Sequence, residues 1–105
     1  MAIKKLQNDF TTPEQSKRLL ELGVPRCSAN GLQGYRGIKV LEKPDYDNPS
    51  PCWSVGRLNE IFKICSDNHI EIYDLDLKGT QIERAMQAFE NYAKYNWLDF
   101  STLEE

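Results

Sequence analysis

The chain has 105 residues, of which 40% are hydrophobic and 28% charged, with a formal net charge of −3. This length suits one modest hydrophobic core, and we expect a single globular domain over residues 1–105. The composition excludes a disordered chain, and the acidic balance disfavours nucleic-acid binding, which needs a basic face.

The cysteines indicate the compartment. Cys27, Cys52 and Cys65 are odd in number and form no Cys-x-x-Cys pair. A disulfide framework or a zinc ribbon is therefore disfavoured, and free thiols in a reducing cytosol are expected. The N-terminus lacks the apolar run of a signal peptide, and no segment approaches the about 20 apolar residues that span a bilayer. We expect a cytoplasmic protein with no membrane segment, no metal and no cofactor.

The first element is a helix over residues 13–22. Thr12 precedes Pro13, and Gln15 stands where its side chain can reach back to the backbone N–H of Thr12. This is the pattern of a capping box with proline at the first helical position. Gly23 predicts the end of the helix, because glycine readily takes the left-handed conformation found there.

A loop, a strand and a second loop follow. Residues 26–34 are predicted as a loop, with Gly31 and Gly34 as turn or hairpin glycines. The alternation of apolar and polar residues over 35–41 predicts a strand. Residues 42–51 contain three prolines, which lack a backbone donor, so no regular element is expected there.

A second helix is predicted over residues 54–65, with Ser54 as its cap. Its apolar stripe has helical spacing: Val55, Leu58, Ile61, Phe62 and Cys65. Trp53 stands just before the cap and is expected to fold over this stripe. Gly56 lowers helix propensity, which close approach of another segment would explain.

The last third contains a predicted strand and the longest predicted helix. Residues 69–77 alternate in polarity, which predicts a strand. Thr80 and Glu83 form a second capping box that opens a helix over residues 80–96. The apolar face of this helix is broad: Ile82, Ala85, Met86, Phe89, Tyr92 and Ala93.

These elements predict an α+β fold in which three helices pack on a small sheet of two or three strands. The connection between residues 41 and 69 is long enough for a parallel crossover, and an antiparallel pairing is equally allowed. Two strands alone make a poor sheet, so a third short strand or a dimer partner is expected to complete it.

Candidate catalytic residues are few. His69 is the one histidine, and no nucleophile or metal ligand stands at a recognisable spacing from it, so a structural role is expected. Cys52 lies just before a predicted helix N-terminus, where the pKa of a thiol can fall. A Cys52–His69 pair assembled by the fold is the alternative that would make the chain a small enzyme or thiol-reactive protein.

Four aromatic residues are candidate interaction residues, because aromatic side chains bury large areas at protein interfaces. They are Trp53, Tyr92, Tyr95 and Trp97. Core packing is expected to account for most of the aromatic residues, and one or two left on the surface would mark a contact patch.

Two stretches carry a family resemblance. They are Phe10-Thr-Thr-Pro-Glu-Gln-Ser-Lys-Arg-Leu-Leu-Glu-Leu-Gly-Val-Pro25 and Pro51-Cys-Trp-Ser-Val-Gly-Arg-Leu58. They resemble a family of small uncharacterised proteins of gut Bacteroidetes, often found in phage or mobile-element settings. That family ends in a helix like 82–98 here, while 26–50 does not align with it. The resemblance implies a bacterial origin and a mobile-element context, and it transfers no catalytic residue.

The function expected from these observations is a non-enzymatic accessory or protein-interaction domain of a bacterial phage or mobile element. Its partner would be another protein or a second copy of the chain. The alternatives are the thiol enzyme that uses Cys52 with His69 and a nucleic-acid-binding accessory protein.

Overall fold

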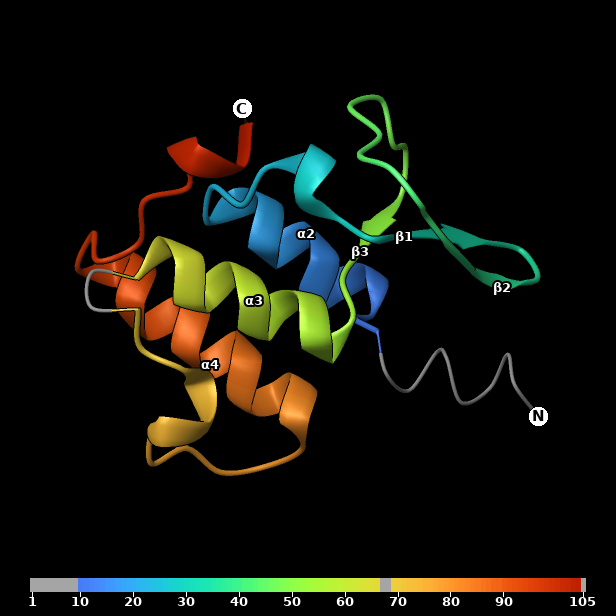
Figure 1. Ribbon diagram of the computed structural model, residues 1–105. Helices are drawn as coiled ribbons and strands as arrows, with labels where there is room; N and C mark the ends of the chain where they lie inside the picture. Colours follow the sequence, from blue (N-terminus) through green and yellow to red (C-terminus); the bar gives the residue numbers. More distant parts are fainter. Residues whose placement is uncertain (1–9, 67–68, 105) are drawn as a thin grey trace.

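The structure, a computed structural model, describes residues 10–66 and 69–104, and it has the α+β fold predicted from the sequence. Its α-helices are α2 (Pro13–Glu21), α3 (Val55–Cys65) and α4 (Gln81–Lys94). Its strands are β1 (Gly31–Gly34), β2 (Gly37–Val40) and β3 (Pro51–Cys52), in the order β2-β1-β3 and antiparallel throughout. Short 3₁₀ helices are η1 (Arg26–Ser28), η2 (Ile72–Asp74) and η3 (Ser101–Glu104). The β1–β2 hairpin projects from one end of the helical body (Figure 1).

The helix starts are where the capping residues predict them. The Thr12 hydroxyl accepts the N–H of Gln15 at 3.2 Å, and the Gln15 side chain accepts the N–H of Thr12 at 2.9 Å. Thr80 and Glu83 make the same reciprocal pair at the start of α4. Each box satisfies two backbone donors that a helix N-terminus leaves unpaired.

The ends of α2 and α4 share one geometry. Gly23 has φ 105°, and Val24 donates its N–H to the Leu19 carbonyl at 3.0 Å. Asn96 has φ 58°, and Trp97 donates its N–H to the Tyr92 carbonyl at 2.9 Å. Both are Schellman motifs, which satisfy terminal carbonyl groups of the helix. The predicted end of α4 at residue 96 is two residues too late, because Asn96 takes the left-handed conformation.

The predicted strand over 35–41 is half of a hairpin. Tyr35 and Arg36 form a two-residue turn between β1 and β2, so Tyr35 is not in a strand. Gly34 pairs with Gly37 across this turn, and Gly37 has φ 117°. The glycines are therefore hairpin glycines, as predicted, while β1 and η1 lie in the stretch predicted as a loop. The third short strand, β3, completes the sheet.

The proline-rich stretch has no regular element until β3, but Asn48 anchors it. Asn48 is buried, and its side-chain amide donates to the Gly31 carbonyl at 3.1 Å. Its side-chain oxygen accepts the N–H of Ser50 at 3.1 Å, and its backbone carbonyl accepts a hydrogen bond from Arg26 at 2.6 Å. Asn48 thus fixes the loop to the sheet through its side chain and to η1 through its backbone carbonyl.

The predicted strand over 69–77 is wrong. The segment is irregular, contains η2, and makes local hydrogen bonds such as that from the Leu75 N–H to the Ile72 carbonyl at 3.0 Å. Ile72 is buried, and Ile70 and Leu75 pack partly buried against the core. The apolar spacing changes from two residues (Ile70 to Ile72) to three (Ile72 to Leu75), which is the period of a 3₁₀ turn. The strand pairing proposed with 35–41 therefore does not form.

Trp53 lies at the centre of the core and is completely buried. Its indole N–H donates to the Ser28 hydroxyl at 3.0 Å. Its backbone N–H donates to the Thr11 hydroxyl at 3.0 Å, and its carbonyl accepts the Thr11 N–H at 2.9 Å. Next to it, the Asn30 side chain bonds both the N–H and the hydroxyl of Ser54. The segment that opens α3 is therefore hydrogen-bonded to two distant parts of the chain, at Thr11 and at residues 28–30.

Replacing Trp53 by phenylalanine should lower the free energy of unfolding by about 2–3 kcal/mol. The change removes the bond from the indole to Ser28 and leaves space that the smaller ring does not fill. Urea denaturation followed by circular dichroism measures the effect. A loss below 0.5 kcal/mol would show that the buried indole N–H contributes little.

Two glycines should respond to alanine with opposite signs. Gly56, on the exposed side of α3, has no atom of the described residues within 4 Å of the position of an added Cβ, so none of these residues makes the predicted close approach. Gly56→Ala should therefore stabilise the protein by about 0.5 kcal/mol through helix propensity. At Gly31 an added Cβ would lie 2.8 Å from both the Cys52 sulfur and the Phe10 ring. Gly31→Ala should destabilise by about 1–3 kcal/mol in the same denaturation experiment.

Candidate functional site

The structure does not bring Cys52 and His69 together. Cys52 lies before the start of α3, and His69 lies beyond its end. An 11-residue helix separates them, which at 1.5 Å per residue is a distance of about 16 Å. His69 is exposed, and its Nδ1 lies 3.1 Å from the Lys63 carbonyl at the end of α3. The alternative of a Cys52–His69 catalytic pair is therefore wrong for this fold.

Cys52 is not an activated thiol either. It is 1% exposed, and burial raises its pKa to about 11 from the ordinary value of 9.0. A nucleophilic thiol needs a lowered pKa and access to a reagent. Cys27 and Cys65 are also buried, so the three cysteines lie in the interior.

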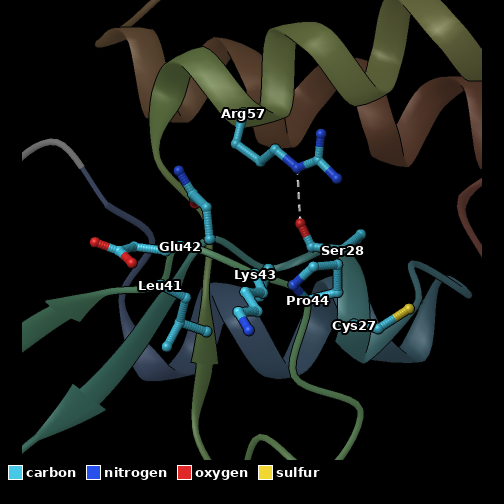
Figure 2. Close-up of a pocket in the computed structure, with 9 residues that line it drawn as sticks. Cys27, Ser28, Leu41, Glu42, Lys43, Pro44 and Arg57 are labelled. Carbon is cyan, nitrogen blue, oxygen red and sulfur yellow. Dashed lines mark hydrogen bonds between the residues drawn. The ribbon is translucent and has the colours of Figure 1, made fainter.

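A small cavity of about 240 Å³ lies between the first turn of α3, η1 and the segment that follows β2. Figure 2 shows Arg57 reaching across it, where its Nε donates to the Ser28 carbonyl at 2.8 Å. The same guanidinium pairs with Glu60. Lys43 also lines the cavity, whereas the Cys27 sulfur lies 3.8 Å from the Leu103 carbonyl. Arg57 therefore links η1 to α3 across this cavity.

Trp53, one of the four aromatic residues predicted to make contacts, does not reach the surface. It is fully buried, and its indole N–H is used by Ser28. Its expected folding over the α3 stripe has taken it into the core. We therefore exclude Trp53 from any contact surface.

The other three predicted residues, Tyr92, Tyr95 and Trp97, gather at the end of α4 and are called here the C-terminal aromatic cluster. Tyr95 and Trp97 stack with ring centroids 4.7 Å apart and an angle of 27° between their planes. Trp97 also meets the Tyr92 ring edge-to-face at 5.3 Å. Tyr95 is 56% exposed and Trp97 48% exposed, while Tyr92 is partly buried.

The cluster rests on the core. Tyr92 packs edge-to-face on Phe62 of α3 with centroids 4.8 Å apart, and Phe62 packs on Phe89 at 5.5 Å. Phe62 and Phe89 are completely buried. A continuous series of ring contacts therefore runs from the interior to the two exposed rings, which holds the outer pair against a rigid base.

The helix end explains why the cluster forms. In the Schellman motif of α4, Tyr92 is the residue that contributes the carbonyl, and Trp97 is the residue that returns to it. A side-chain contact between these two positions commonly accompanies the motif. Asn96 supplies the left-handed residue that turns Trp97 back. Sequence reasoning missed Asn96, although asparagine is, after glycine, the residue most often found there.

One cation lies beside the cluster. The Lys94 ammonium is 5.7 Å from the centroid of the Tyr95 ring, within the range of a cation–π contact. The exposed surface thus combines two flat apolar faces with a positive charge.

Residues 10–66 and 69–104 contain neither a membrane-spanning helix nor a metal-binding group of side chains. None of the helices in this part of the chain has the length and apolarity needed to cross a bilayer. Nor does it hold a group of three histidine, cysteine or acidic side chains placed to bind a metal ion.

Comparisons of the chain with protein-family models, with curated proteins and with solved structures give no match. The resemblance of 10–25 and 51–58 to a Bacteroidetes family remains a prediction.

The buried Cys52 thiol predicts a loss of stability at high pH. Its folded-state pKa is raised above the unfolded value, so its contribution is complete below pH 9 and is lost as pH rises from 9 to 11. Relative to Cys52→Ala, the free energy of unfolding should fall by up to about 1.4 kcal/mol per pH unit in that window. Urea denaturation of both proteins from pH 8 to 11 measures this difference, and parallel curves would contradict it.

Proposed function

We propose that the protein is a non-enzymatic binding module of a bacterial phage or mobile element that contacts another protein through its C-terminal aromatic cluster. The observation that supports this most is the stacked Tyr95–Trp97 pair, about half exposed and mounted on buried rings. The family resemblance supports the phage or mobile-element setting. The cytoplasm is the compartment favoured by an odd number of cysteines with no Cys-x-x-Cys pair.

The exposed pair has the properties of an interface anchor. Tryptophan and tyrosine dominate the residues whose truncation weakens protein complexes most, because they bury large areas and lose few rotamers. Here the rings are already held by stacking and by the edge contact with Tyr92, so little further ordering is needed on binding. A rigid aromatic pair binds more tightly than the same residues on a mobile loop.

The surroundings indicate the chemistry of the partner surface. Lys94 lies beside Tyr95, so a partner with an apolar recess and an acidic residue at its rim would match the cluster. Such a surface differs from a nucleic-acid site, which would need several basic residues around the rings.

Replacing Trp97 by serine should weaken the complex by about 2 kcal/mol, or about thirtyfold in Kd, since it removes one ring of the anchor. The partner is first retained from a lysate of the bacterial host on immobilised protein and identified by mass spectrometry. The Kd of the purified pair is then measured by isothermal titration calorimetry for the wild type, Trp97→Ser and Tyr95→Ser.

Tyr73→Ser is the matched control, because Tyr73 is 72% exposed and lies on η2, outside the aromatic cluster. It should leave the Kd unchanged. Equal affinity of the wild type and Trp97→Ser would contradict the proposal, as would a partner that Tyr73→Ser loses and Trp97→Ser keeps.

A further inference from the structure

The β1–β2 hairpin ends in an open sheet edge. Leu41 donates its N–H to the Asn30 carbonyl at 3.0 Å, continuing the pairing of β2 with β1. Because backbone groups alternate along an antiparallel strand, those of Gly37 and Lys39 face β1, and those of Ile38 and Val40 face away. No other described residue hydrogen-bonds to these outward groups.

The opposite edge of the sheet is closed. Beside β3, Phe10 forms a bridge with Ser54, and Thr11 and Trp53 exchange two hydrogen bonds. Further along the sheet, Gln33 donates its N–H to the Ser50 carbonyl at 2.9 Å. The chain thus covers the sheet edge beside β3. The other edge strand, β2, lies in the projecting β1–β2 hairpin, away from the helices (Figure 1).

Several exposed side chains of the β1–β2 hairpin are apolar. Val40 is 53% exposed, Ile38 is partly exposed, and the Tyr35 ring at the turn is fully exposed. Lys39 lies between Ile38 and Val40 and points to the other face of the hairpin. An added strand would therefore meet apolar side chains on one face and a lysine on the other.

Residues 31–43, which include the β1–β2 hairpin, carry a net positive charge, whereas the whole chain is net negative. Residues 31–43 contain Arg36, Lys39 and Lys43 against one acidic residue, Glu42, in a protein of net charge −3. A second copy is a poor occupant. Pairing that uses both Ile38 and Val40 would set Lys39 directly opposite Lys39 of the other copy, and like charges in that position are destabilising.

We propose that the β2 edge binds an extended acidic segment of a partner protein, which adds a fourth strand to the sheet. The segment pairs its backbone with Ile38 and Val40, places an acidic residue opposite Lys39, and sets β-branched residues against Ile38 and Val40. The alternating donors and acceptors of the edge fit a peptide backbone. This partner site is additional to the C-terminal aromatic cluster, which lies at the other end of the molecule (Figure 1).

The test is a titration of the ¹⁵N-labelled full chain with two blocked peptides. One is acetyl-Thr-Val-Glu-Val-Glu-Val-Thr-amide, and the other has lysine in place of each glutamate. The glutamate peptide should shift the amide resonances of 31–41 and slow hydrogen exchange at Ile38 and Val40 about tenfold. Raising NaCl from 50 to 500 mM should weaken binding of the glutamate peptide several-fold, since exposed charges are screened. The lysine peptide should bind at least about fivefold more weakly.

Two variants separate charge from backbone pairing. Lys39→Glu should reverse the preference between the peptides. Val40→Pro removes an outward N–H without touching the bonds to β1, and proline is tolerated on edge strands, so it should abolish binding of both peptides. Lys78→Glu makes the same charge change at an exposed residue outside the sheet and should leave binding unchanged.

Several results would overturn the proposal. One is an unchanged rate of hydrogen exchange at Ile38 and Val40 when the glutamate peptide is added, and another is equal affinity for both peptides. Tighter binding of a poly-dT oligonucleotide at residues 31–41, or a dimer formed through β2 in sedimentation equilibrium, would also contradict it. Trp97→Ser should leave the peptide titration unaltered, so failure at this edge and failure of the aromatic site are separately visible.

Discussion

The fold depends on the burial of one short segment, Pro51–Ser54, around Trp53. This segment is at once the last strand of the sheet and the start of α3. Every polar group of Trp53 is used by a residue from elsewhere in the chain, so the indole enters the core without an unpaired donor. Thr11, Ser28 and Asn30 all hydrogen-bond to this segment, so it fixes the start of α3 relative to the sheet and to η1.

Local chemistry explains which elements could be predicted. The starts of α2, α3 and α4 follow from Thr12, Ser54 and Thr80, whose side chains act within the next three residues. A helix start of this kind can be predicted from sequence, because the donor and the acceptor of the capping hydrogen bond are only a few residues apart. Elements fixed by distant contacts were missed or misassigned. β1 exists because Gly31 lets Cys52 and Phe10 approach, and η2 exists because Ile72 and Leu75 both face the helical core.

The candidate site also has features that could be predicted from local sequence and features that could not. The residue types of Tyr92, Tyr95 and Trp97 indicated an aromatic surface, and their clustering follows from a local helix end at Asn96. The exclusion of Trp53 could not be predicted, since its hydrogen-bond partners lie 25 and 42 residues away. The separation of Cys52 from His69, by contrast, follows from the helix predicted over residues 54–65, because α3 lies between the two residues.

The pairing of Thr11 with Trp53 also bears on how the chain reaches its native state. The two residues are 42 positions apart, so the N-terminal segment finds its place only after a long loop has closed. Because α2 is synthesised before β3, it has no sheet edge beside it until β3 has left the ribosome. A nine-residue helix is marginal alone, so α2 gains its stability late. Contacts between α3 and α4, such as those of Phe62 with Phe89 and Tyr92, span fewer residues than the Thr11–Trp53 pairing and therefore close smaller loops.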